Sequence, residues 1–276
     1  MNFQKENIIS CKEYCSIKKK ELKSKLDNVK QIPTLAVVQI DDNKSSNAYI
    51  NGKKKDCEEV GIKFVHFKLE SSKYTQEDLC NILISLSNDE LMNGIIVQLP
   101  IPEKYNVEEL LANITPDKDV DGFRKDSCFE SCTPKGIIEW LEYNKYDFTG
   151  KQVTVLGRSK IVGKPLVNML IDRGSTVISC NSHTKNIEKY TQDSDLVISA
   201  VGKANLFCCE MPENGIVVDV GINHDIDGKL CGDINRNYVN NNIKNTYVTP
   251  VPGGVGLLTR VALLDNITKS CEMRKD

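Results

Sequence analysis

Short apolar runs alternate with amphipathic segments along almost the whole chain. Thr34–Ile40 is nearly continuous in apolar residues, which is typical of a strand buried on both faces. Apolar residues between 79 and 86 recur at helical spacing, and a capping box at 75–78 precedes them. We also expect a helical N-terminal segment, further strands at 64–69, 94–99, 153–156, 176–179, 196–200, 216–220 and 247–249, and further helices at 48–60, 107–113, 133–141, 165–173 and 257–268. Ser45 and Ser46 are the expected N-caps of 48–60, and Thr133 that of 133–141.

This alternation predicts an α/β fold made of βαβ units, with parallel sheets covered by helices. A chain of 276 residues suits two domains, and a boundary near 120–150 fits the polar stretch 117–132. Lys and Arg number 36 against 38 Asp and Glu, so the chain lacks the basic excess of a nucleic-acid-binding protein. No apolar run suggests a membrane span or a signal peptide. We therefore expect a cytoplasmic protein.

The eleven cysteines are irregularly spaced and form no Cys-x-x-Cys pair. The chain has three histidines, and none of them lies beside a close-spaced cysteine pair. A zinc site would need a second such ligand pair. We expect reduced thiols and no metal site.

The segment 153–165 combines a strand, a glycine turn and a helix start. Gly157-Arg158-Ser159 forms the turn, where backbone N–H groups and a helix N-terminus are able to bind a pyrophosphate. Ser159 replaces the middle glycine of the usual fingerprint, and a plain strand–helix connection is the alternative. The next strand runs into Ser182 without an acidic residue to bind a ribose 2′-hydroxyl, so Arg158 favours NADP over NAD.

Polar residues in the first half are candidates for a second site. Tyr49 and Lys53 share one face of the predicted helix, although a solvated lysine run is the alternative reading. Gln98 interrupts an apolar strand, where an unpartnered amide costs about 1–3 kcal/mol. It is either a satisfied structural group or a site residue at the carboxyl end of a strand.

Two further segments contain glycine next to candidate ligand-binding positions. Asp121 precedes Gly122, which is typical of an Asx turn as well as of a site loop. Pro252 and Gly253 belong to a glycine-rich stretch at 251–256, which either approaches a ligand closely or simply leads into the last helix.

Six segments, in order and across nearly the whole chain, resemble the bifunctional methylenetetrahydrofolate dehydrogenase/cyclohydrolase family. They are 45–55, 94–102, 118–123, 132–134, 157–159 and 249–256. The resemblance implies an N-terminal three-layer α/β domain over 1–119, joined by a C-terminal helix at 257–276 that returns to it. It also implies a Rossmann-like NAD(P)-binding domain over 120–256.

The resemblance further implies an oxidoreductase and hydrolase of one-carbon metabolism and purine biosynthesis. Such an enzyme oxidises 5,10-methylenetetrahydrofolate with NADP to the 5,10-methenyl form, and hydrolyses this to 10-formyltetrahydrofolate. Its partner is a small-molecule folate, and the family typically forms a homodimer. Nucleic-acid and membrane partners are not expected.

The same resemblance assigns roles to individual residues. Lys53 is implied as the key cyclohydrolase residue, Gln98 as the group that tunes it, and Tyr49 as a residue that orients the folate. The implied substrate-binding residues are Tyr49, Asp121, Pro252 and Gly253, and the implied cofactor-binding residues are Gly157, Arg158, Ser159, Ser182 and Ile222.

Three positions depart from the family pattern. Leu257 stands where the family usually has Pro, which we expect to loosen the glycine-rich loop. Asn181 replaces a His, and His183 replaces an Arg or Lys, so less positive charge surrounds the expected 2′-phosphate. These departures leave two alternative functions open. One is that of a dehydrogenase-only relative that uses NAD, and the other is that of a binding module without catalysis. The intact set around Lys53 argues against the second alternative.

Overall fold

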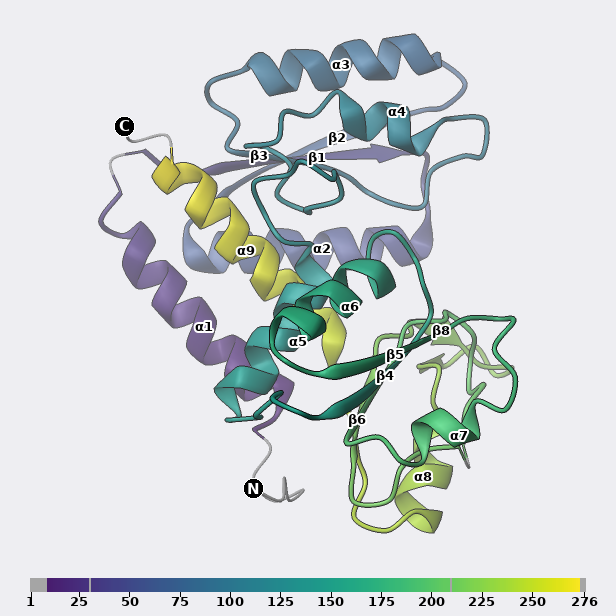
Figure 1. Ribbon diagram of the computed structural model, residues 1–276. Coiled ribbons are helices and arrows are strands. Elements are labelled where there is room, and N and C mark those ends of the chain that lie inside the picture. The colour runs from purple at the N-terminus through teal and green to yellow at the C-terminus, as the bar shows by residue number, and fades with distance from the viewer. Residues whose placement is uncertain (1–8, 30, 209, 274–276) are drawn as a thin grey trace. The chain divides into compact units, whose positions relative to one another are not determined.

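The computed structural model describes residues 9–29, 31–208 and 210–273 (Figure 1). Helices and strands alternate, as the sequence predicts. In chain order the elements are α1 (Cys11–Leu26), β1 (Thr34–Ile40), α2 (Lys44–Val60), β2 (Lys63–Leu69), α3 (Gln76–Asn88), β3 (Gly94–Val97), α4 (Val107–Ala112), α5 (Cys132–Tyr143), β4 (Gln152–Leu156), α6 (Gly163–Asp172), β5 (Thr176–Cys180), α7 (Glu188–Thr191), β6 (Leu196–Ser199), β7 (Ile216–Asp219), β8 (Asn223–His224), β9 (Leu230–Cys231), α8 (Arg236–Asn242), β10 (Tyr247–Val248) and α9 (Val255–Met273).

The described residues divide into two compact units. The first unit comprises 16–132 together with 260–273, and the second unit comprises 9–15 together with 133–259. The last helix, α9, therefore begins in the second unit and continues in the first.

The first unit has three layers around a parallel sheet in the order β2-β1-β3. Alternate residues of β1 serve opposite faces, as expected for a strand. Leu35 and Val37 pack with α1, α2 and α9, whereas Ala36 and Val38 pack toward α3 and α4. Figure 1 shows α2 and α3 on the two sides of this sheet. Residues 262–264 and 267 of α9 belong to the same core, which confirms that the last helix returns to the N-terminal domain.

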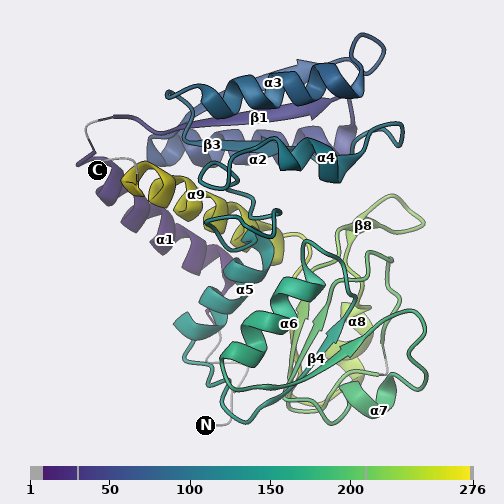
Figure 2. The same ribbon diagram turned by 45° about the horizontal axis from the view of Figure 1, so that its top comes forward.

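The second unit contains a parallel sheet in the order β10-β7-β6-β4-β5, which confirms the Rossmann-like prediction. Val217 of β7 packs with Val239 of α8 on one face, and α6 packs on β4 and β5. Figure 2 shows α6 and α8 on opposite sides of the strands. Because all paired strands of this sheet are parallel, the loops that follow them emerge at one edge.

Several predicted boundaries differ from the structure. Asn43 caps α2 by accepting a hydrogen bond from the Ser46 N–H at 3.0 Å, so the predicted serine N-caps at 45 and 46 were wrong. The helix α5 begins at Cys132, so Thr133 is helical and is not the N-cap. In contrast, the capping box between Thr75 and Asp78 is confirmed. The strand predicted at 94–99 ends at Val97, before the cis Leu99–Pro100 bond.

In the described part of the chain, no helix is long and apolar enough to span a bilayer. Within the same ranges, no group of three or more His, Cys, Asp or Glu residues could hold a metal ion. The ten cysteines that the structure describes are thiols, and Cys209 lies outside the described residues.

Candidate functional site

Lys53 is buried in the first unit, with 5% of its surface exposed. It lies on α2, one helical turn after Tyr49, and its Nζ is 5.2 Å from the centre of the Tyr49 ring. The same Nζ donates a hydrogen bond to Oε1 of Gln98 at 3.2 Å. A buried ammonium or amine is stable when it has such partners. The structure thus places Lys53 between an aromatic ring and an amide.

Gln98 follows β3 at its carboxyl end and is also buried. Its Nε2 donates to the carbonyl oxygen of Leu99 at 2.7 Å, so its Oε1 is left to accept from Lys53. Both ends of the amide are partnered, which offsets the cost of burying it at the end of an apolar strand. Gln98 is therefore a fixed acceptor aimed at Lys53.

Asp121 is buried in the same unit, with 8% of its surface exposed. Burial raises the pKa of its carboxyl group, while the positive charge of Lys53 opposes this effect. The Asn266 amide of α9 donates to the neighbouring carbonyl of Val120 at 2.8 Å and fixes this segment. Lys53 thus contacts Tyr49 and Gln98 and interacts electrostatically with Asp121.

The turn after β4 requires glycine at position 157. Gly157 has φ +106°, and a Cβ there would overlap the carbonyl oxygen of Ala200. Ser159 follows with a hydroxyl that accepts from the N–H groups of Val162 and Gly163, at 3.2 and 3.3 Å. Ser159 therefore stabilises the turn that leads into α6, whose N-cap residue is Val162, a task that the sequence alone did not reveal.

Arg158 is exposed at this turn and held in a fixed direction. Its Nε donates to the Ser179 hydroxyl at 3.1 Å, and its guanidinium also donates to the Ser179 carbonyl oxygen. Ser179 belongs to β5, which leads to Ser182. The Asn181 side chain accepts from the His183 N–H at 3.1 Å and forms a turn that leaves Ser182 exposed.

The other site residues predicted in the second unit come after strands of its parallel sheet, at the edge where the carboxyl ends of the strands lie. Ile222 comes after β7 and is 55% exposed, and Pro252 and Gly253 come after β10. Gly157 and Ser182 follow β4 and β5. In open α/β sheets, ligands bind at the carboxyl ends of the strands.

Leu257 lies in the first turn of α9. Its N–H donates to the Gly254 carbonyl oxygen at 2.9 Å, a hydrogen bond that a proline cannot make. The bond ties the glycine-rich loop to the helix. A loosening effect of Leu257 stays a prediction.

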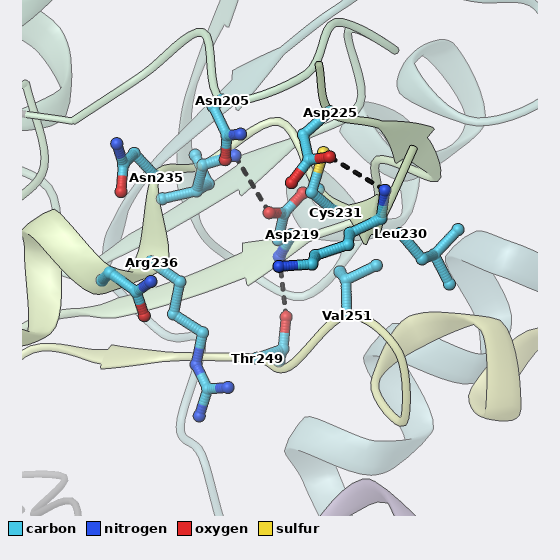
Figure 3. Close-up of a pocket in the computed structure, with 13 residues that line it drawn as sticks. Asn205, Asp219, Asp225, Leu230, Cys231, Asn235, Arg236, Thr249 and Val251 are labelled. Atoms are coloured by element: carbon cyan, nitrogen blue, oxygen red, sulfur yellow. Dashed lines mark hydrogen bonds between the residues drawn. The ribbon is translucent and has the colours of Figure 1, made fainter. Parts of the chain in front are cut away.

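A pocket of about 370 Å³ lies beside the carboxyl ends of β7 and β10. Asp219, Leu230, Thr249 and Val251 contribute to its wall (Figure 3). The Asp219 N–H donates to the Thr249 hydroxyl at 2.8 Å. None of the site residues predicted from the sequence lines this pocket.

Two aspartates that organise the second unit were missed by sequence reasoning. The Asp219 carboxylate accepts from the N–H groups of Gly221, Asp233 and Ile234, and burial raises its pKa to about 6. The Asp233 carboxylate accepts from the N–H groups of 201–203, the loop after β6. An acidic residue at the end of the apolar run Ile216-Val-Val-Asp219 was the available signal.

The fold and these residues define a two-domain enzyme with a nucleotide-binding Rossmann-like domain. Comparison with known families agrees. The tetrahydrofolate dehydrogenase/cyclohydrolase catalytic domain matches residues 9–121, and the NAD(P)-binding domain of the same family matches 131–275. The chain belongs to the tetrahydrofolate dehydrogenase/cyclohydrolase family.

Individual relatives are similar over nearly their whole length. The Bifunctional protein FolD of Bacillus subtilis is 38% identical over 278 residues, which cover 96% of this chain and 97% of the relative. The crystal structure of the Campylobacter jejuni bifunctional FolD has a TM-score of 0.91 at 38% identity, and covers 96% of this chain and 98% of its own. The Trypanosoma brucei FolD structure, complexed with NADP cofactor and inhibitor, has a TM-score of 0.88 at 28% identity, covering 96% of this chain and 97% of its own.

Proposed function

We propose that the chain oxidises 5,10-methylenetetrahydrofolate to 5,10-methenyltetrahydrofolate with NADP, and hydrolyses the product to 10-formyltetrahydrofolate. The observation that carries this proposal is the buried Lys53–Gln98 hydrogen bond beside Asp121. We assign the folate chemistry to 1–119 together with 257–276, and cofactor binding to 120–256.

The residues of the second unit fit NADP. Gly157 allows the tight turn after β4, and residues 181–187, which follow β5, include no acidic side chain that would repel a 2′-phosphate. In this proposal Arg158 and Ser182 bind that phosphate, while Gly157, Ser159 and Ile222 border the rest of the cofactor. A guanidinium suits the task because it is always charged and donates several hydrogen bonds. When bound, NADP accepts the hydride of the substrate's one-carbon unit.

Lys53 serves the hydrolysis step. Water adds to the methenyl carbon, and Lys53 assists the transfer of the proton that the water loses. The hydroxyl group on this carbon then loses its proton and forms the formyl C=O, the bond from the carbon to N5 breaks with its electron pair staying on N5, and N5 takes up that proton. The hydrogen bond from Lys53 to Gln98 fixes the position of Nζ. Gln98 thereby orients Lys53 for the proton transfer.

The other residues bind the folate. The ionised carboxylate of Asp121 accepts hydrogen bonds from pterin N–H groups, and its burial strengthens them. Tyr49 orients the pterin through its ring, while Pro252 and Gly253 contact the substrate from the loop after β10. These roles complete the set that the resemblance implies.

We further propose a cytoplasmic homodimer that supplies formyl groups for purine biosynthesis. Thiols, rather than disulfides, at the ten described cysteines support a reducing compartment. The second unit has exposed apolar side chains that support self-association: Leu230, which lines the pocket, and Leu206, Ile226 and Tyr238, each next in sequence to a residue that lines it. Sedimentation analysis tests the homodimer, and a monomer at micromolar concentration would contradict it.

The activity is tested by mixing the protein with methylenetetrahydrofolate and either NADP or NAD. We expect absorbance changes for reduced cofactor and for the methenyl product, followed by decay of the methenyl signal as it is hydrolysed. NADP should give the higher kcat/KM. No absorbance change with either cofactor would refute the proposal.

A further inference from the structure

Gln39 is a polar residue inside the apolar strand β1. It is 2% exposed, and the two-residue period of a strand places it on the face of Leu35 and Val37, toward α2. A buried amide at such a position requires partners for both its donor and its acceptor.

Gln39 finds these partners in a chain of side-chain hydrogen bonds. Its Oε1 lies 2.9 Å from Nε2 of His66 on β2. Its Nε2 donates to Oδ1 of Asn47 at 2.8 Å, and Nδ2 of Asn47 donates to Oδ1 of Asp42 at 2.8 Å. We call these four residues the Gln39 chain.

The chemistry of its last member fixes the direction of the Gln39 chain. An ionised Asp42 only accepts, so Asn47 must donate to it and must accept from Gln39. The Gln39 oxygen then accepts from His66, which therefore carries a proton on Nε2. Burial, with the positive charges of Lys68 and Lys54, lowers the pKa of His66, so its ring is neutral near pH 7.

The Gln39 chain ends in the first turn of α2. Asn47 precedes Lys53 by six residues, or about 9 Å along the helix axis. The Gln98 N–H donates to the carbonyl oxygen of Val38 at 2.8 Å, so Gln98 lies beside the end of β1. Two glutamine side chains thus bond to helix α2. Gln39 of β1 bonds to Asn47, and Gln98, which follows β3, bonds to Lys53.

We propose that Gln39 is a positioning residue for the folate site, which acts through Asn47 to fix the first turns of α2 and the ring of Tyr49. This inference rests on the proposed function. Gln39 acts at a distance from the reacting atoms, because its amide donates to Asn47 and accepts from His66. Its loss should therefore weaken folate binding more than it slows turnover.

Reversing the direction of the Gln39 chain tests the proposal. In Gln39→Glu the new carboxylate accepts from His66 but cannot donate to Asn47. Asn47 must then turn its amide toward residue 39, which points its oxygen at Asp42, another acceptor. Adding Asp42→Asn supplies the missing donor and restores both links of Asn47 in the opposite direction, while His66 donates to residue 39 as before.

We expect Gln39→Glu to raise the KM for methylenetetrahydrofolate about fivefold or more, with kcat within about twofold. Asp42→Asn alone keeps an acceptor and should be near wild type. The Gln39→Glu/Asp42→Asn double variant should recover the wild-type KM. The matched control is Gln39→Glu/Asp41→Asn, which removes the same charge one residue away from the Gln39 chain and should not recover.

An unchanged KM in Gln39→Glu, or equal recovery in both double variants, would overturn the proposal. If Gln39→Glu does not fold, Gln39→Met replaces it in the test. This variant should raise the KM for methylenetetrahydrofolate, and adding Asp42→Asn should not rescue it. A wild-type KM in Gln39→Met would also overturn the proposal. Nitrogen NMR of wild-type His66 should show the Nε2-protonated ring at pH 7, and the Nδ1-protonated ring would contradict the chain. Wild-type turnover in the same assay separates failure of this inference from failure of the proposed function.

Discussion

Nζ of Lys53 and Oε1 of Gln98 are 3.2 Å apart, and both side chains are buried. The lysine comes from a helix and the glutamine from the end of a strand, 45 residues later. A buried hydrogen bond that involves a basic group contributes more free energy than a hydrogen bond between neutral groups at the surface. The cyclohydrolase step should therefore depend on this pair.

Replacing Gln98 with Leu leaves the Lys53 amine without its fixed acceptor. We expect cyclohydrolase kcat to fall by about 10- to 100-fold, because hydrogen bonds to charged groups contribute about 1.5–3 kcal/mol. The KM for NADP should stay unchanged, since Gln98 lies in the other unit from the cofactor turn. Steady-state hydrolysis of methenyltetrahydrofolate measures the effect. Wild-type hydrolysis in Gln98→Leu would exclude the tuning role.

The raised pKa of Asp121 gives folate binding a pH dependence. The carboxylate accepts hydrogen bonds when ionised, so affinity is full above its pKa and is lost as pH falls through it. Because burial raises this pKa, the loss should begin at a higher pH than for an exposed aspartate. The KM for methylenetetrahydrofolate, measured against pH, should rise on the acidic side. Asp121→Asn should remove this rise, and an identical profile in both proteins would contradict the assignment.

Arg158 should carry much of the preference for NADP. We expect Arg158→Ala to reduce the ratio of kcat/KM for NADP over NAD by about 10- to 100-fold, through loss of charge-assisted hydrogen bonds to the 2′-phosphate. Lys164, an exposed lysine on α6, offers a matched control for general loss of positive charge. Equal selectivity changes in Arg158→Ala and Lys164→Ala would show that Arg158 has no specific role.

Position 157 disfavours any residue other than glycine for two reasons, its backbone conformation and the contact that a side chain would make. Gly157→Ala should destabilise the protein by about 1–3 kcal/mol, because the φ of +106° is strained and the new Cβ would overlap the Ala200 carbonyl oxygen. Gly228 has φ +75° with nothing near its missing Cβ, so Gly228→Ala isolates the strain alone. Thermal unfolding should give a larger decrease in Tm for Gly157→Ala. Equal decreases would rule out the contact.

Local sequence patterns predicted most of the fold because they reflect local physics. The apolar run of β1 and the Thr75 capping box fall where expected, since burial on both faces and helix capping leave direct signatures. The helix α8 was missed because its Asn-rich sequence has low helix propensity, and its Val239 is buried only by tertiary packing. The short β8–β9 hairpin likewise has too few residues to show a period.

The candidate site was predicted less evenly. The resemblance brought Lys53, Gln98 and Asp121 together, although they are far apart in sequence. The sequence could not reveal that Asp219 and Asp233 organise loops of the second unit, because their partners are backbone N–H groups that any residue carries. The role of Gln39 was hidden for a different reason, because its partners are side chains from two other elements.

The central claim is that Lys53 performs the hydrolysis but is not required for the oxidation. The direct test is Lys53→Met, given methylenetetrahydrofolate and NADP while reduced cofactor and methenyltetrahydrofolate are followed together. We predict that NADP is still reduced and that methenyltetrahydrofolate accumulates without enzymatic decay. Decay of the methenyl signal at the wild-type rate in Lys53→Met would contradict the account.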